Sequence, residues 1–327
     1  MSSIEKTPLE VAQMVEEAET RIRQYILHTP LAYTPRLSKD SGVEVYLKLE
    51  NEQWTGSFKI RGAFNKLSIL KTEGVSKIYT ATTGNHGMAS ALGCKTLGLD
   101  GIVVVPVSSD SEKKEKLLEA GVNLLQHGCD CFEAEEHARG LAERERVPYL
   151  SPYNDYHVIA GQGTTGIELI KDLPDVDAVF VSVGGGSLIG GIAAYLKCKR
   201  PQCKIIGCSP RNNKVMHESV KNGQIIQEES YDTLSDGTGG GIEPGTVTFP
   251  LCRDLVDDWV LVEEEEIADA IFYCLQAHKK VIEGAAGVPL AALKKVSGNF
   301  KGKRVAVVLC GANISTRNLQ LILNTHP

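Results

Sequence analysis

The chain has 327 residues, of which 42% are hydrophobic, and its net charge is −6 at pH 7. This length allows a sizeable buried core and predicts roughly two domains. The acidic balance, with no long basic run, excludes the positive surface that binds nucleic acids, and no stretch approaches ~18 uninterrupted apolar residues, which excludes a membrane span. The polar N-terminal segment 1–19 has no apolar signal sequence, so we expect a cytoplasmic protein.

The nine cysteines are scattered along the chain. An odd number in a protein of this size that is expected in the cytoplasm predicts free thiols rather than a disulfide framework. One dense cluster, at 127–131, contains two cysteines and a histidine, but no second cysteine pair lies at the spacing of a zinc site. We therefore expect no bound metal ion.

Short β-branched segments alternate with segments of helical periodicity along most of the chain. An entry helix at 8–24 and a strand at 42–50 come first. Buried parallel strands are predicted at 77–81, 101–107, 178–183, 204–208 and 304–309. Helices are predicted between them at 86–97, 110–120, 131–144, 163–172, 188–199 and 264–280. The class is therefore α/β, with two open, mostly parallel twisted sheets flanked by helices.

No linker rich in proline or glycine marks a domain boundary. We expect the chain to cross between domains near residues 71–75 and again near 150–155. A large domain would then comprise residues 1–74 and 152–327, and residues 75–151 would form a small domain inserted in it.

Lys59, in the segment SFKIRG at 57–62, is the first candidate for chemistry. A solvated lysine is protonated at neutral pH, so an amine that condenses with an aldehyde needs burial or a cationic neighbour to lower its pKa. Phe58 and Ile60 supply apolar flanks, and Arg61 supplies a nearby charge. Taken alone, the segment favours an ordinary surface lysine over a catalytic one.

Three strand-to-helix turns supply groups that suit an anionic ligand. The first, Thr82–Gly87, directly follows the strand 77–81 and directly precedes a helix. The unpaired N–H groups and the dipole of a helix start bind a carboxylate or a phosphate. The alternative is an ordinary tight turn, in which Gly84 supplies an unusual dihedral angle and Thr83 caps the helix.

The second turn, at 184–191, has five glycines in eight residues. Consecutive amides without Cβ atoms form a concave anion site, so a phosphate is the natural ligand, and close packing of helix on strand is the alternative. The dinucleotide pattern G-x-G-x-x-G fails because its sixth position is Ile189. Nicotinamide chemistry is therefore a weak alternative.

The third turn, Cys310–Asn313, ends the strand 304–309 and places an uncharged thiol at the carboxyl edge of the sheet. Ligands of open α/β sheets bind at that edge. A cysteine in such a place is also commonly a small buried apolar residue.

Together these segments resemble the serine/threonine dehydratase and serine racemase family of pyridoxal-phosphate enzymes, which shares fold type II with tryptophan synthase β. The resemblance spans nearly the whole chain in ordered motifs. They are HTPL at 28–31, SFKIRGA at 57–63, GNHG at 84–87, AGQGT at 160–164, the glycine loop, LVDD at 255–258, IE at 282–283 and CGAN at 310–313.

The resemblance implies a role for each site residue. Lys59 would hold pyridoxal 5′-phosphate covalently and act as the catalytic base. The other expected cofactor contacts are Phe58 and Asn85 at the ring, Cys310 at the pyridine nitrogen, Glu283 nearby, and Gly184, Gly185, Gly186, Ser187 and Leu188 at the phosphate. The inserted domain would clasp the substrate carboxylate with Thr82, Thr83, Gly84, Asn85 and His86. The family also implies a homodimer.

Two positions depart from the family pattern. Thr83 lies where serine racemase has the serine that protonates the opposite face of the substrate, and its extra methyl group puts racemisation in doubt. The segment 209–213 lacks the acidic residue of the family's divalent-cation site, so again no metal is expected.

The predicted function is a pyridoxal-phosphate-dependent ammonia-lyase that converts a small β-hydroxy amino acid into a 2-keto acid and ammonia. L-serine and L-threonine are the default substrates, and 3-hydroxyaspartate or an aryl-serine are further candidates. A racemase of the same fold is the main alternative, and a non-catalytic amino-acid or phosphate-binding protein is another.

Overall fold

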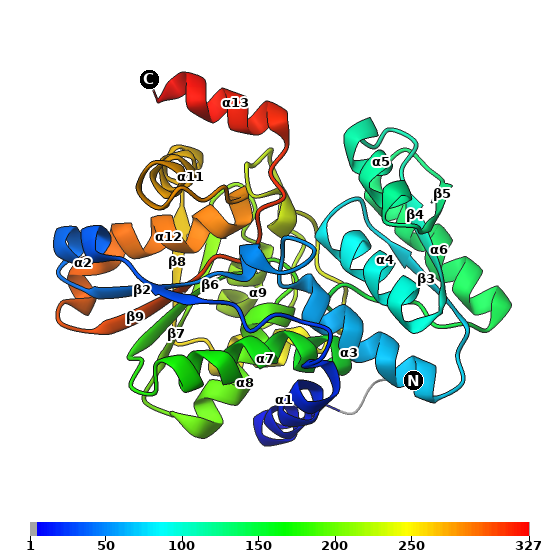
Figure 1. Ribbon diagram of the computed structural model, residues 1–327, viewed down its shortest axis with the longest axis horizontal. Helices are drawn as coiled ribbons and strands as arrows, with labels where there is room; N and C mark the ends of the chain where they lie inside the picture. The colour runs from blue at the N-terminus through cyan, green and yellow to red at the C-terminus, as the bar shows by residue number, and fades with distance from the viewer. Residues whose placement is uncertain (1–4, 327) are drawn as a thin grey trace.

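The computed structural model describes residues 5–326. Their strands form a six-stranded sheet of order β1-β2-β9-β6-β7-β8 and a three-stranded sheet of order β3-β4-β5. Helices flank both sheets (Figure 1). This arrangement confirms the predicted α/β class with two sheets.

The six-stranded sheet is parallel except at one edge. Its strands are β1 (Leu31–Tyr33), β2 (Glu44–Lys48), β9 (Arg304–Val308), β6 (Ala178–Ser182), β7 (Lys204–Pro210) and β8 (Asp258–Val262), and only β1 runs antiparallel to its neighbour. All five residues of β6 are buried, as expected for a central parallel strand covered on both faces. The carboxyl ends of β9 and β6 therefore meet in the middle of one edge.

Helices cover both faces of this sheet (Figure 1). On one face lie α1 (Pro8–Ile22), α7 (Tyr156–Asp172) and α8 (Ser187–Lys199), and on the other lie α11 (Glu264–His278) and α12 (Gly284–Val296). The remaining helices of this unit are α2 (Pro35–Ser41), α9 (Val215–Asn222), α10 (Thr248–Leu255), α13 (Thr316–Thr325) and the 3-10 helices η1 (Glu50–Glu52), η2 (Asp236–Thr238) and η3 (Ser297–Phe300). We call this sheet and its helices the large unit.

The three-stranded sheet is parallel and consists of β3 (Lys77–Ala81), β4 (Asp100–Val105) and β5 (Asn123–Gln126). On one face Val103 and Val105 pack with Leu117 of α5 (Ser111–Glu119), beside α4 (Asn85–Leu97). On the other face Val104 packs with Ala138 of α6 (Cys131–Glu145). We call this sheet with α4, α5 and α6 the small unit.

Helix α3 (Lys59–Thr72) lies between the two units and contacts both α7 and α4. The periodicity predicted most strands and helices to within a few residues. It missed the strands β1, β5 and β8 and the helices α2, α3, α9, α10, α12 and α13. It also started the helix at 163–172 too late. That helix begins at Tyr156, because the Asp155 carboxylate caps it by accepting from the N–H groups of His157 and Val158. Among residues 5–326, no helix combines the length and apolar character needed to cross a membrane.

Candidate active site

Lys59 begins α3 at the carboxyl end of β9. The N–H of Phe58 donates to the Cys310 carbonyl at 3.0 Å, and Ser57 pairs with Gly311, so the backbone on both sides of this turn is fixed. The Lys59 Nζ donates to the Pro152 carbonyl at 2.9 Å and lies 5.2 Å from the centre of the Phe58 ring. The amine therefore lies between the edge of the large sheet and the segment that returns from the small unit.

Burial lowers the pKa of Lys59 to about 8, against smaller opposing effects of the nearby Cys310 and Glu283 side chains. The interpretation that Arg61 lowers this pKa is wrong. The Arg61 guanidinium is buried between the carboxylates of Glu50 and Glu168, which neutralise its charge. It is also committed there, so it is not free to bind a second carboxylate of a substrate.

The glycine loop joins β6 to α8. Its N–H groups from Gly184 to Ser187 have no acceptor within residues 5–326. No side chain fits in the loop: an added Cβ would come within 2.9 Å of the Thr238 Cα at Gly184, and within 2.8 Å of the Tyr153 ring at Gly185. At Gly186, where φ is +85°, only glycine avoids backbone strain. Leu188 follows in the first turn of α8 and is buried.

Cys310 lies at the adjacent strand end. Its Sγ is 3.7 Å from the Oγ of Ser182, the last residue of β6, and that hydroxyl donates to the Ala285 carbonyl. Burial raises the pKa of Cys310 far above its ordinary value, so the thiol stays neutral.

Glu283 is a buried carboxyl group at the start of α12. The Asn85 amide donates to its two oxygens at 2.9 and 3.0 Å, and the Asn313 N–H donates at 3.1 Å. Burial raises the pKa of Glu283 to about 7, opposed by the bond from Asn85. The Asn313 side chain also donates to the Asn85 carbonyl oxygen at 2.6 Å. Asn85 of the small unit is thus tied to two residues of the large unit.

The turn Thr82–His86 forms the start of α4, as predicted. The Thr82 hydroxyl accepts from the Gly84 N–H, and an added Cβ at Gly84 would meet open space. The N–H groups of Thr83, Asn85 and His86 have no acceptor in the described part of the chain. The His86 imidazole is buried against the Leu150 carbonyl, and burial lowers its pKa to about 3, so it is neutral. The His86 N–H is available to a ligand, and the buried Nδ1 of its ring has no partner among residues 5–326.

Sequence reasoning missed one whole segment, 236–243. Its Thr238 packs on Gly184, and a Cβ at Gly237 would lie 3.6 Å from the Glu283 carboxylate. The N–H of Glu243 donates to the hydroxyl of Tyr153, whose ring covers Gly185. The signal was the run of glycines from 237 to 241, which neither periodicity nor a known turn pattern explains.

The comparisons with known proteins agree with this geometry. A family model described as "Pyridoxal-phosphate dependent enzyme" matches residues 22–311. The chain belongs to this family of enzymes. An "L-threonine ammonia-lyase" of Thermotoga maritima is 41% identical over 312 residues, which are 95% of this chain and 77% of that protein.

Two solved structures of similar proteins share the fold. The processed form of threonine deaminase isoform 2 from Solanum lycopersicum has a TM-score of 0.92 and 31% identity, covering 97% of this chain and 88% of that one. Maize serine racemase has a TM-score of 0.89 and 28% identity, covering 96% and 97%.

Pyridoxal 5′-phosphate is therefore the cofactor, and the residues fit it. The free N–H groups of the glycine loop, at the start of a 13-residue helix, suit its phosphate. The Lys59 amine suits its aldehyde, and the neutral Cys310 thiol suits a ring nitrogen.

No group of three or more His, Cys, Asp or Glu side chains within residues 5–326 is arranged to hold a metal ion. Arg211, in the segment 209–213, forms an ion pair with Glu263.

Proposed function

We propose that the protein is an ammonia-lyase that removes water and then ammonia from a small β-hydroxy amino acid, with L-threonine and L-serine as substrates. The observation that carries this proposal is the buried Lys59 amine, whose pKa is about 8, at the meeting point of the glycine loop, Cys310 and the turn before α4. The similarity to the Thermotoga maritima and Solanum lycopersicum proteins supports the choice of threonine.

Each group of this chain has a task in the elimination. The free N–H groups of the turn Thr82–His86 and the dipole of α4 bind the substrate carboxylate. The Lys59 amine, neutral in an appreciable fraction of molecules near pH 8, accepts the proton from the substrate Cα. The Pro152 carbonyl, 2.9 Å away, accepts a hydrogen bond from the amine and orients it.

When bound, the cofactor supplies an electron-withdrawing ring that stabilises negative charge at Cα. The Cys310 thiol remains neutral and does not keep a ring nitrogen protonated as a carboxylate would. Such a ring would withdraw less negative charge from Cα, which would favour loss of the β-hydroxyl group over return of a proton to Cα.

A panel of β-hydroxy amino acids tests the proposal. L-threonine, L-serine, 3-hydroxyaspartate and phenylserine are each incubated with the holoenzyme, and ammonia and 2-keto acid are measured together. We expect equal amounts of both products from L-threonine and L-serine. Absence of keto acid from all four substrates would contradict the function.

Racemisation is the second candidate, favoured by the similarity to maize serine racemase, and Thr83 is the residue on which it depends. Its side chain is only partly buried, and its hydroxyl forms no hydrogen bond to any residue of 5–326. We expect Thr83→Ala to retain cofactor absorption and most elimination from L-threonine, with Thr83→Ser as the matched control. Chiral chromatography checks whether D-serine forms and whether Thr83→Ala abolishes it. Loss of elimination with an intact spectrum would show that Thr83 is essential rather than secondary.

Three broader features complete the proposal. The domain boundaries are placed at 74–75 and 151–152, supported by the division of the strands between two sheets.

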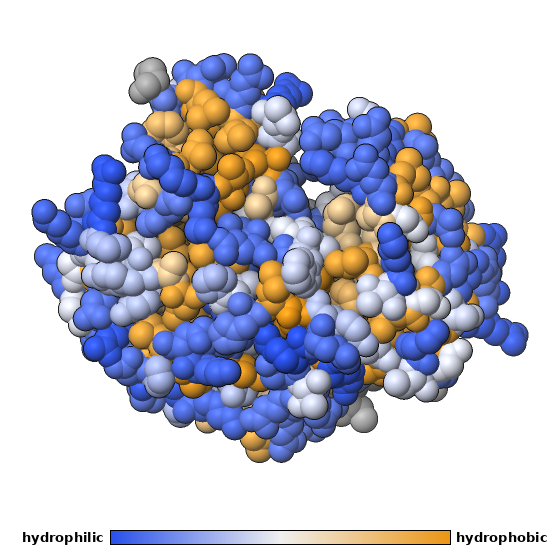
Figure 2. Space-filling view, viewed as in Figure 1, coloured by the Kyte–Doolittle hydropathy of each residue, from blue (hydrophilic) through white to orange (hydrophobic). Residues whose placement is uncertain are grey.

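A cytoplasmic location is supported by nine cysteines that are all free thiols. A homodimer is supported by the exposed apolar side chains of Leu321 and Leu323 on α13. An apolar area of the surface lies beside this helix (Figure 2). Light scattering during size-exclusion chromatography checks the dimer.

A further inference from the structure

Arg61, two residues after Lys59, is the centre of a fully buried ion network. The exposed fractions of the side chains are 0% for Arg61, Lys48 and Glu50 and 1% for Glu168. Two positive and two negative charges therefore balance in the interior. Burial alone raises the pKa of Glu168, but Arg61 and Lys48 lower it well below its usual range, so the carboxylate stays ionised.

All five N–H donors of Arg61 are used. Nε and Nη2 donate to the two oxygens of Glu50 at 2.7 and 2.8 Å, and Nη1 and Nη2 donate to the two oxygens of Glu168, both at 2.9 Å. The last donor of Nη1 goes to the Thr164 hydroxyl at 3.1 Å. Only a planar guanidinium can satisfy two carboxylates in this way, and an ammonium group cannot.

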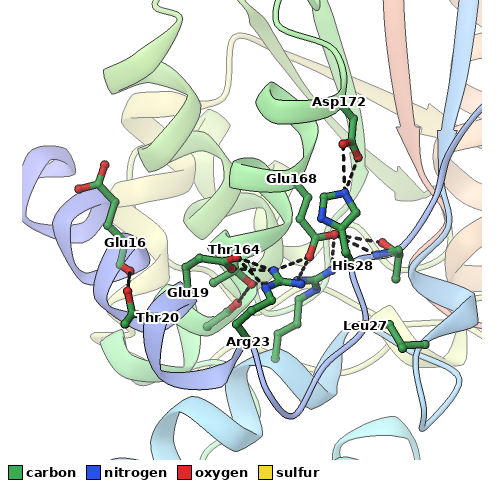
Figure 3. Close-up of polar contacts among 12 residues, drawn as sticks. Glu16, Glu19, Thr20, Arg23, Leu27, His28, Thr164, Glu168 and Asp172 are labelled. Atoms are coloured by element: carbon green, nitrogen blue, oxygen red, sulfur yellow. Dashed lines mark hydrogen bonds and ion pairs between the residues drawn. The ribbon is translucent and has the colours of Figure 1, made fainter.

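Glu168 connects this arginine to several elements at once. It also accepts from Lys48 on β2 and from the N–H of Thr29. Arg23, just after α1, donates to it as well (Figure 3). The network thus joins α3 to α7, η1, β2 and the C-terminal end of α1. Helices α3 and α7 touch backbone to backbone at the same level, since an added Cβ at Gly161 would lie 2.6 Å from the Gly62 Cα.

A buried network of this kind adds little net stability over apolar side chains, because desolvation offsets the attraction between the charges. Its contribution is to orientation, because each bidentate pair between Arg61 and a carboxylate allows only one orientation of α3. The Lys59 amine is the group that depends on that orientation, since it lies in the same helical turn and the Arg61 N–H donates to the Phe58 carbonyl at 3.0 Å.

We propose that Arg61, through Glu50, Glu168 and Thr164, is a positioning residue that fixes the Lys59 amine against Pro152 and toward the cofactor. The inference rests on the proposed role of Lys59. It goes further in assigning a catalytic consequence to an arginine that contacts neither substrate nor cofactor. A displacement of about 1 Å in a reacting group can lower a rate about a hundredfold, so small changes in α3 are measurable.

The test compares two charge-conserving variants as holoenzymes acting on L-threonine. Arg61→Lys and Arg23→Lys both keep a positive charge beside Glu168, but only the first changes α3 itself. For Arg61→Lys we expect kcat to fall about tenfold or more while KM changes less than about threefold. For Arg23→Lys we expect both parameters to stay within about twofold of the wild type.

A second readout does not depend on turnover. Cofactor-depleted protein is mixed with pyridoxal 5′-phosphate, and the rate at which the visible absorption returns is measured against pH. In the wild type this rate should rise with a midpoint near pH 8, where Lys59 loses its proton. In Arg61→Lys the amine moves toward solvent and the midpoint shifts to higher pH. A purely structural defect lowers the amount of folded protein without moving the midpoint.

If Arg61→Lys does not fold, two variants of Thr164 test the inference instead. Thr164→Val removes the hydroxyl that accepts from Arg61 Nη1 and donates to the Gly161 carbonyl within α7, and it should lower kcat. Thr164→Ser keeps that hydroxyl and should retain the wild-type kcat. Wild-type kcat and midpoint in Arg61→Lys, or wild-type kcat in Thr164→Val, would overturn the inference, as would an equal loss in Arg23→Lys. Failure of the proposed function is distinct, because the wild type itself would then release no ammonia.

Discussion

Lys59 and Glu283 are ionisable groups whose charged forms are both disfavoured by burial. The pKa of Lys59 falls to about 8 and that of Glu283 rises to about 7. Near neutral pH each group therefore exchanges protons easily, which suits a site that must accept and release a proton in every cycle. The pH dependence of stability provides a direct check on the environment of Glu283.

Glu283→Gln should become more stable relative to the wild type as the pH rises. The pKa of Glu283 is about 7 in the folded protein, against an ordinary value of 4.5. Between these values the unfolded chain loses this proton and the folded protein keeps it, so wild-type stability falls as the pH rises through this window. The total effect is on the order of 3 kcal/mol. Glutamine does not ionise in this window, so the stability of the variant does not show this decrease.

The measurement is urea unfolding of both cofactor-free proteins at pH 4.5 and pH 7.5. The free energy of unfolding of the variant minus that of the wild type should be larger at pH 7.5. Asn85→Asp is a useful companion, because it removes the amide that donates to Glu283. A difference that stays constant between the two pH values would show that the Glu283 carboxyl is not held in its protonated form.

The sequence points to candidate site residues but not to the partners that surround them. Lys59, Cys310 and the glycine loop stand in local patterns whose chemistry can be read directly. The bond between Asn85 and Glu283 joins residues 198 positions apart, and no local pattern contains it. Arg61 was interpreted wrongly for the same reason, since its partner Glu168 is 107 positions away.

At the scale of elements, glycines set how closely the helices of the large unit approach one another. Helices α7 and α8 touch along their backbones, and an added Cβ at Gly191 would lie 2.7 Å from the Gly163 nitrogen. This contact holds α8 against the face of the sheet, with its first turn and the glycine loop at the carboxyl edge. Gly191 therefore supports the phosphate site without contacting it.

Gly191→Ala should destabilise the protein by about 1–3 kcal/mol, because the methyl group forces two backbones apart. Gly140→Ala is the matched control: Gly140 is also inside a helix, α6, and its added Cβ would meet open space. There the change should stabilise by about 0.5–1 kcal/mol through helix propensity. Thermal unfolding of both variants measures the contrast, and similar shifts in the same direction would contradict the close contact.

The sequence predicted elements well where a single physical signal dominated. Strand β6 is a continuous apolar run and was found at the right place. Helix α7 was found only in its second half, because Gly161 and Gly163 near its start resemble turn residues although they serve packing. Strand β5 has no buried residue and therefore lacks the apolar signature of a strand.

For the whole molecule, the relation between the two units governs access to the site. The surface is hollowed between them (Figure 2). Two ion pairs cross from the small unit to the segment 236–243: Lys113 to Asp236 at 2.9 Å and Arg139 to Glu243 at 2.7 Å. Because this segment packs on Gly184 and approaches Glu283, its order should depend on both ion pairs.

A variant with Lys113→Gln and Arg139→Gln should exchange amide hydrogens faster in the segment 236–243. Partly exposed ion pairs contribute only about 0–1 kcal/mol each, so the melting temperature should change little. Lys199→Gln is the control, because Lys199 pairs with Glu16 between α8 and α1. Unchanged exchange in the double variant, or equal acceleration in the control, would show that the order of the segment 236–243 does not depend on the two ion pairs.

The most direct measurement is borohydride reduction of the holoenzyme followed by mass spectrometry of its peptides. We expect one pyridoxyl group, located on Lys59, and loss of the visible absorption on reduction. The Lys59→Ala protein should take up no such group and release no ammonia from L-threonine. A pyridoxyl group on another lysine of the native protein, or turnover by Lys59→Ala, would contradict the assignment of the site.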